Sequence, residues 1–235
     1  MVLTNMQGFL HGGRAAGHAH FAFPRKRGAE FSFKLSVAEV DFHSLMSDLN
    51  GKTNRLEGML NGELTVVAAN TEQPNSWMGY GNVHLRDGVI WEIPVFGLFS
   101  PILNTIVPGL GNSRAKQGSG EFLITNSVIS TKDLDIQATA MRMHFAGTLD
   151  FEKRINSRVE AELLRDLPGI GLLVSKILWP VTKIFEYEVT GTLGEPKAEP
   201  LYIIPKVLLI PLQPLKILKD IVTPAPVPPP PKPPQ

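Results

Sequence analysis

A repeated pattern of glycines and strand-like residues constrains the fold of this chain more than any other feature. One copy runs from Gly79 to Ile90 and the other from Gly118 to Ile129. Each begins with Gly-x-Gly, continues with alternating apolar and polar residues, and reaches a turn-like pair, Asp87-Gly88 or Asn126-Ser127, before a second apolar stretch. Internal repeats decide the architecture of a chain. This unit predicts a β-hairpin, so we expect stacked hairpins rather than one closed core.

Alternation elsewhere predicts further strands. Apolar residues occupy every second position of residues 31–37, and strand-like patterns return at 56–68, 154–163 and 187–193. Strict alternation is typical of a strand with one buried and one exposed face. The apolar parity changes between Ala138 and Met141, which requires a turn or bulge there. The predicted fold class is therefore mainly β, a long twisted antiparallel sheet of repeated hairpins with a few short helices.

Three segments have helical character. Residues 42–49 place apolar side chains at helical spacing after Asp41, a suitable N-cap. Residues 96–107 predict a short apolar helix with Pro101 in its first turn. Residues 168–185 are the most apolar block and also have helical spacing, interrupted by Pro180.

The same patterns divide the chain into four parts. Residues 1–18 are rich in glycine and histidine without periodicity, and we expect a flexible arm there. Residues 19–200 carry the strand and helix patterns and form the predicted β domain. Residues 201–222 are apolar but interrupted by prolines, and residues 223–235 are a Pro-rich tail that cannot build a core.

The composition and motifs exclude several functions. The formal net charge is +1 and no basic run exceeds Arg25-Lys26-Arg27, so nucleic acid is not an expected partner. The absence of cysteine excludes disulfides and thiolate catalysis. Strands rather than a helix follow the Gly-x-Gly pairs, so these are not phosphate loops. No catalytic motif is present, and the N-terminal histidines lack the spacing of metal ligands. We predict no enzymatic activity, no cofactor and no metal.

Apolar rows on the predicted strands are the candidate functional surface, and two interpretations of them stay open. One is an ordinary half-buried sheet packed on its own helices. The other is a sheet curled into an open apolar groove that holds acyl chains, with short helices at its mouth or end. Few predicted helices and a charged fraction of only 19% favour the second. The candidate groove residues are Phe31, Phe33, Leu35, Val37, Val83, Leu85, Val89, Trp91, Phe122, Ile124, Val128, Met143, Phe145, Leu149, Phe151, Val159 and Leu163.

The order and spacing of several segments carry a family resemblance across about residues 30–200. The segments are Leu56–Gly58, Trp77–Gly81, Leu85–Trp91, Gly118–Ile136, His144–Phe151, Arg158–Ala161 and Val189–Lys197. Together they resemble the C-terminal region of AsmA-like proteins.

The resemblance implies a protein of the envelope of a Gram-negative-type bacterium, associated with membrane in the periplasm. Its sheet would form a taco-shaped groove that carries phospholipid between the inner and outer membranes and serves outer-membrane assembly. The implied partners are phospholipid or another acyl-chain lipid, a membrane surface and envelope proteins. Such proteins are anchored in the inner membrane by an N-terminal helix and are longer, so we expect this chain to be a C-terminal fragment of a longer protein or a truncated reading frame.

Residues 201–222 have two open interpretations. Apolar side chains could rest in a membrane interface beside nearby lysines, or the segment could pack back onto the sheet. The membrane-proximal candidates are Ile203, Val207, Leu208, Ile210, Leu212 and Leu215. An alternative function for the whole chain is a periplasmic scaffold that binds protein partners through its sheet edges and Pro-rich tail.

Overall fold

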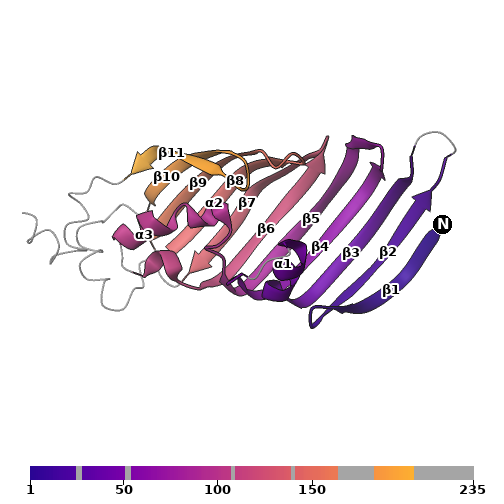
Figure 1. Ribbon diagram of the computed structural model, residues 1–235, viewed down its shortest axis with the longest axis horizontal. Coiled ribbons are helices and arrows are strands. Elements are labelled where there is room, and N and C mark those ends of the chain that lie inside the picture. Colours follow the sequence, from indigo (N-terminus) through magenta and orange to yellow (C-terminus); the bar gives the residue numbers. More distant parts are fainter. Residues whose placement is uncertain (25–27, 51–53, 107–108, 139–140, 164–182, 204–235) are drawn as a thin grey trace, which may run out of the picture.

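The chain folds into one curled antiparallel sheet (Figure 1). The computed structural model describes residues 1–24, 28–50, 54–106, 109–138, 141–163 and 183–203. Within these residues, eleven strands follow one another in sequence order across the sheet, which confirms the predicted fold class. The strands are β1 (Val2–Leu10), β2 (Gly13–Ala22), β3 (Glu30–Asp41), β4 (Glu57–Asn70), β5 (Gln73–Val89), β6 (Ala115–Thr125), β7 (Val128–Ala138), β8 (Met141–Asp150), β9 (Ile155–Leu163), β10 (Lys183–Gly191) and β11 (Pro196–Ile203).

Short helices interrupt the succession of strands at two places. Helix α1 (Phe42–Asn50) joins β3 to β4, and α2 (Pro94–Gly97), α3 (Ser100–Ile106) and the 3-10 turn η1 (Leu110–Asn112) join β5 to β6. The Asp41 carboxylate accepts a hydrogen bond from the Ser44 backbone N–H at 2.7 Å, which confirms the predicted N-cap. The helix predicted at 96–107 is divided into α2 and α3, and Pro101 lies in the first turn of α3 as expected.

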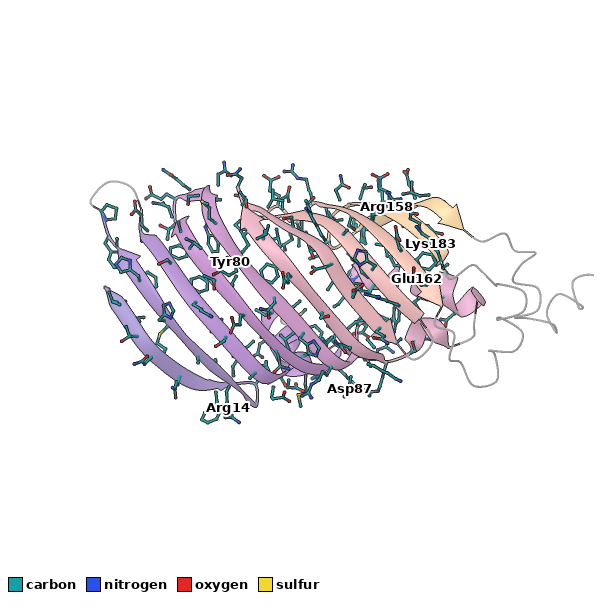
Figure 2. All side chains as sticks on the ribbon, turned by 180° about the vertical axis from the view of Figure 1, so that it is seen from behind. Arg14, Tyr80, Asp87, Arg158, Glu162 and Lys183 are labelled. Atoms are coloured by element: carbon teal, nitrogen blue, oxygen red, sulfur yellow. The ribbon has the colours of Figure 1, made fainter. Side chains whose placement is uncertain are left out.

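The two faces of the sheet differ in polarity because apolar and polar residues alternate along the strands. Residues directly opposite each other on neighbouring strands share a face. Leu35 pairs with Leu64 on the concave face. Lys34 and Glu63 form an ion pair at 3.1 Å on the convex face. Figure 2 looks at the sheet from behind, where Arg14, Arg158, Glu162 and Lys183 lie.

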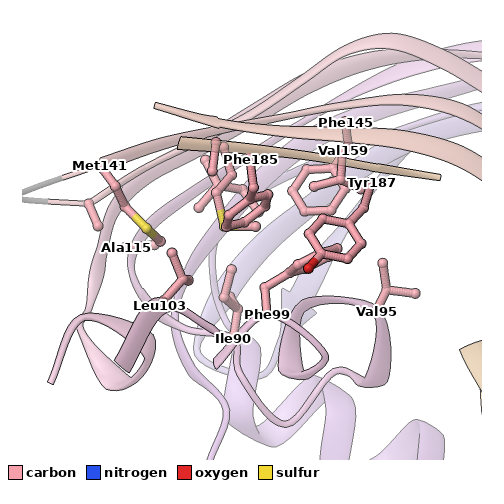
Figure 3. Close-up of a cluster of buried hydrophobic side chains, with 14 of the residues drawn as sticks. Ile90, Val95, Phe99, Leu103, Ala115, Met141, Phe145, Val159, Phe185 and Tyr187 are labelled. Carbon is pink, nitrogen blue, oxygen red and sulfur yellow. The ribbon is translucent and has the colours of Figure 1, made fainter. Parts of the chain in front are cut away.

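Helices α2 and α3 cover the concave face at the end of the sheet formed by β7–β10 (Figures 1 and 3). Phe99, between α2 and α3, has no exposed surface and contacts the rings of Phe145, Phe185 and Tyr187. Leu103 of α3 is equally buried. At this end the sheet packs on its own helices, as the first of the two interpretations expects.

The predicted flexible arm at residues 1–18 is wrong, because β1 and most of β2 form a hairpin there. His11 and Gly12, with φ of 44° and 80°, make its two-residue turn. The concave-face positions of β2 are Ala15, Gly17 and Ala19, which lie opposite Val37, Leu35 and Phe33 of β3. Large side chains on β3 fill the space that small residues leave on β2, so β2 shows no apolar period of its own.

Only the second copy of the repeat forms the predicted hairpin. Asn126 and Ser127 both have positive φ, 52° and 63°, and turn β6 into β7. In the first copy the hairpin prediction is wrong: Asp87, with φ 52°, and Gly88 lie inside β5. The two copies therefore do not stack as hairpins. Their Gly-x-Gly strands, β5 and β6, pair directly with each other in antiparallel register.

The C-terminal predictions are partly wrong and partly outside the described residues. Residues 183–185, predicted as the end of a helix, begin strand β10, and residues 164–182 lie outside the described part of the chain. Strand β11 was not predicted, and it extends the sheet past residue 200 to Ile203. Residues 204–235, including most of the Pro-interrupted segment and the Pro-rich tail, are also outside the described residues.

Candidate apolar groove

Two adjacent hollows lie on the concave face. The first, here called the deep hollow, has a volume of about 260 Å³ and lies between α2 and the inner side of β5–β9. The second, the shallow hollow, has a volume of about 200 Å³ and lies over β3–β6. Val83 of β5 and Phe122 of β6 line both hollows, so one apolar surface continues from β3 to β9. Other apolar residues of the deep hollow are Ile93, Val95, Phe96, Ile129, Leu134, Phe145, Leu149, Ile155 and Leu193.

Glycines of the repeat allow close packing where the two hollows meet. Gly81 lies opposite Phe122, and Gly120 lies opposite Val83. A Cβ atom on Gly81 would lie 2.5 Å from Cζ of Phe122, and one on Gly120 would lie 2.9 Å from Cα of Leu134. These close approaches are possible only without a side chain. The Gly-x-Gly pairs therefore serve the packing of the concave face.

Aromatic rings follow one rim of the groove across several strands. Phe21 of β2 lies 6.2 Å from Phe31 of β3, measured between ring centroids. Trp77 of β5 lies 5.3 Å from Phe31 and 5.4 Å from Phe151, with its ring edge-on to both. Phe31 and Phe151 were predicted, whereas Phe21 and Trp77 were missed. The Trp directly before Gly-x-Gly was the available signal for Trp77, because alternation puts it on the same face as Gly79 and Gly81.

Most of the predicted groove residues lie on the concave face. Leu35, Val37, Val83, Phe122, Phe145 and Leu149 line the hollows. Phe31 and Phe33 stack on each other along β3, and Ile124 of β6 lies opposite Ile129 of the deep hollow. Leu85 packs against the covered end of the sheet.

Some predicted residues belong to the closed core: Phe145 is buried in it while bordering the deep hollow, and Met143, Val159 and Trp91 do not line either hollow. Met143 and Val159 have no exposed surface, because α2 and α3 cover the end of the sheet on which they lie. Trp91 packs against the same core, and its Nε1 donates a hydrogen bond to the Ser113 carbonyl oxygen at 2.8 Å. The side chain of Leu163 is outside the described residues, although its backbone pairs with Met141.

Val89 and Val128 were assigned to the wrong face. Val89 lies opposite the exposed Glu57, because the irregularity at Asp87 changes the parity of β5. The turn between β6 and β7 holds only Asn126 and Ser127, so Val128 lies directly opposite Thr125. Thr125 is exposed on the convex face, and Val128 therefore lies on that face as well. Ile129 lies on the concave face in place of Val128.

Of the six membrane-proximal candidates, only Ile203 lies within the described residues. The backbone of Ile203 pairs with Phe185 at the end of β11. The other five, Val207, Leu208, Ile210, Leu212 and Leu215, lie outside the described residues. Among the helices of the described residues, none has both the length and the apolar character needed to cross a membrane.

The convex face carries paired charges beside exposed apolar side chains, among them Tyr80 and Leu123. Asp135 of β7 accepts hydrogen bonds from Arg142 and His144 of β8, the latter at 3.0 Å. Partial burial acts to raise the pKa of Asp135, but these hydrogen bonds outweigh it and hold the pKa below its usual value. Glu186, which is buried, pairs with Arg158 and Lys183. In the described part of the chain no three His, Asp or Glu side chains are placed to hold a metal ion.

Comparison with known proteins adds no relative. No family model matches the chain, and neither a curated protein nor a solved structure matches it. The geometry of the concave face therefore carries the functional argument.

Proposed function

We propose that this chain is a non-enzymatic module that binds the acyl chains of phospholipids in the deep and shallow hollows. The supporting observation is their continuity: Val83 and Phe122 belong to both, so an apolar path runs across the sheet without a polar barrier. The resemblance to AsmA-like proteins supports a role in moving lipid between the two membranes of a Gram-negative-type bacterium, within a longer protein of the periplasm.

The dimensions of the path suit an acyl chain. From β3 to β9 it crosses about 29 Å along the sheet, at a strand spacing of about 4.8 Å. Half of a bilayer hydrocarbon core, which one acyl chain spans, is about 15 Å thick. One chain therefore fits along the path with room for movement.

Burial provides the driving force for binding. Each methylene group removed from water contributes about 0.8 kcal/mol. Two glutamates border the hollows without opposing this gain. Glu63 pairs with Lys34 on the convex face, and the exposed Glu121 alternates with Phe122 and lies on that face too. A path of this kind binds chains by their length and apolar character, without a reactive group.

A matched pair of substitutions on β6 tests the proposal. Phe122→Glu places a carboxylate at the junction of the hollows, whereas Leu123→Glu places it on the convex face, where Leu123 is already exposed. Binding of a phospholipid with a fluorescent acyl chain is expected to weaken at least about tenfold in the first variant and to change less than about twofold in the second.

Mass spectrometry of the protein purified under mild extraction supplies the second measurement. Co-purifying phospholipid in the wild-type protein and its loss from Phe122→Glu are expected. Equal binding by both variants, or no acyl-chain binding by the wild-type protein, would overturn the proposal. A stably bound protein in place of lipid would favour the scaffold alternative.

A further inference from the structure

A row of small and polar residues crosses the floor of the deep hollow. Thr131 of β7 lies opposite Gly147 of β8, and Gly147 lies opposite Ser157 of β9, so the three share the concave face. All three line the deep hollow. The neighbouring rows on the same strands are apolar: Ile129, Leu149 and Ile155 on one side, and Leu134, Phe145 and Val159 on the other.

Ser157 differs from the other buried polar groups in having no partner. It is 9% exposed, and its Oγ is buried without a hydrogen bond. Glu186 Oε1 is the only other such atom among the described residues, and it forms an ion pair with Arg158. Thr131, in the same row as Ser157, is hydrogen-bonded to Asp133. An unpaired buried hydroxyl is unfavourable, so a ligand oxygen in the hollow would complete the hydrogen bonding of Ser157.

The hydroxyl of Ser157 has room to turn toward the hollow. Serine has one side-chain torsion that places Oγ, and rotation about it moves Oγ among three staggered positions without moving the strand. Gly147 provides the space beside it, because a Cβ atom on Gly147 would lie 2.5 Å from Cβ of Ser157. A serine hydroxyl donates one hydrogen bond. In a phospholipid, the polar atoms nearest to an acyl chain are the ester oxygens, which accept hydrogen bonds.

We propose that Ser157 donates a hydrogen bond to the ester carbonyl of an acyl chain bound in the deep hollow. This inference rests on the proposed function and adds the orientation of the lipid. Ser157 lies on β9, at one end of the apolar path, so the ester end lies there and the methyl end points toward β3. A chain about 15 Å long covers about three strand spacings of about 4.8 Å and ends near Phe122 of β6.

The head group leaves the hollow beside the turns at the β9 end. Ile155 and Leu193 line the hollow there, and the Leu193 N–H donates a hydrogen bond to the Lys153 carbonyl oxygen at 2.8 Å. Lys153 itself is exposed. In this orientation the charged phosphate stays in solvent near a cation and does not enter the apolar path.

Lipids with ester and ether linkages test the contact. A dialkyl ether phosphatidylglycerol has the head group and chain lengths of the diacyl form but no carbonyl oxygen. In competition with the fluorescent phospholipid, the ester form is expected to bind the wild-type protein about threefold to tenfold more tightly, the range for one hydrogen bond. Ser157→Ala is expected to reduce this ratio to about one. Ser130→Ala, on the convex face opposite Leu123, is the matched control and keeps the wild-type ratio.

Infrared spectroscopy gives a second measurement, with a lipid isotopically labelled at its ester carbonyl carbon. The carbonyl band of the bound lipid is expected at lower frequency in the wild-type protein than in Ser157→Ala, because a hydrogen bond weakens the C=O bond. The unfolding free energy of the lipid-free protein should not fall in Ser157→Ala, since no hydrogen bond within the protein is lost. An identical carbonyl band in both proteins, or a clear loss of stability in the variant, would overturn the inference.

The lipid competition also separates this inference from the proposed function. Equal binding of ester and ether lipids by the wild-type protein contradicts the Ser157 contact alone. An ester preference that persists in Ser157→Ala does the same. Binding of neither lipid contradicts the proposed function, and the contact that rests on it.

Discussion

Phe99 stacks on Phe185, with ring centroids 5.3 Å apart and ring planes 13° from parallel. Phe99 belongs to the connection between β5 and β6, whereas Phe185 lies in β10. Neither ring has exposed surface. The contact joins two distant parts of the sequence and holds the helical connection over the end of the sheet (Figure 3). It therefore sets the boundary between the closed core and the open groove.

Phe99→Ala is expected to lower the free energy of unfolding by about 3–5 kcal/mol, since it removes a fully buried ring and leaves a cavity. Urea denaturation followed by circular dichroism measures the change. Tyr80→Ala is the control, because Tyr80 lies exposed on the convex face (Figure 2), and a change of about 1 kcal/mol or less is expected there. Similar losses in both variants would contradict the assigned role of Phe99.

Gly81→Ala is expected to disturb both stability and lipid binding. The added Cβ would lie 2.3 Å from the Glu63 carbonyl oxygen and 2.5 Å from the Phe122 ring, so the backbone and the ring must both move. Overpacking of this kind costs about 1–3 kcal/mol. Unfolding free energy and affinity for the fluorescent phospholipid are the two measurements.

Gly118→Ala is the matched control for Gly81→Ala. Gly118 of β6 lies on the concave face of the sheet, as Gly81 of β5 does. A Cβ atom added to Gly118 would lie 3.8 Å from its nearest neighbours, an ordinary contact distance. We expect little change in stability or lipid affinity. If both alanine variants behave alike, Gly81 does not have the special packing role assigned to it.

The sequence predicted best the elements in which large apolar side chains recur with the period of a strand or of a helix. Large apolar residues at alternate positions of 31–37 identified β3, and helical spacing after Asp41 identified α1. Strand β2 was missed because its concave positions are Ala15, Gly17 and Ala19, which acquire their role only opposite the large residues of β3. Strand β11 was missed because its two prolines argue against a strand unless the strand lies at an edge.

The groove was predicted in outline but not in extent. The face of Val89 and of Val128 depends on one irregularity at Asp87 and on the length of one turn, which a local pattern does not reveal. The closure over Met143 and Val159 depends on the contact of Phe99 with β10, a tertiary contact with no local signature.

Acid is expected to destabilise the protein partly through Asp135. The folded-state pKa of Asp135 is lowered from the ordinary 3.8, because hydrogen bonds from Arg142 and His144 outweigh the opposing effect of burial. A carboxyl with a depressed folded-state pKa stabilises the fold above its unfolded pKa, and this stabilisation is lost as pH falls through the folded-state value. The urea concentration at the unfolding midpoint, measured at decreasing pH from pH 6, should therefore decrease once the pH is below about 4. Asp135→Asn should lower stability at pH 6 and flatten the acid-side decrease, and an unchanged decrease would contradict the assignment.

Asp41 is expected to stabilise α1 through its side-chain cap. Asp41→Ala leaves the Ser44 N–H without its partner and should cost about 1 kcal/mol, whereas Asp41→Asn keeps an acceptor oxygen and should cost less. Hydrogen bonds from Ser44 also lower the pKa of Asp41 below 3.8, so its charged form contributes stability above that value and loses it in acid. Amide hydrogen exchange in residues 42–49, compared between the two variants at neutral pH, is the measurement. Faster exchange in the alanine variant alone supports the cap, and equal rates in both variants would show that Asp41 does not hold this helix end.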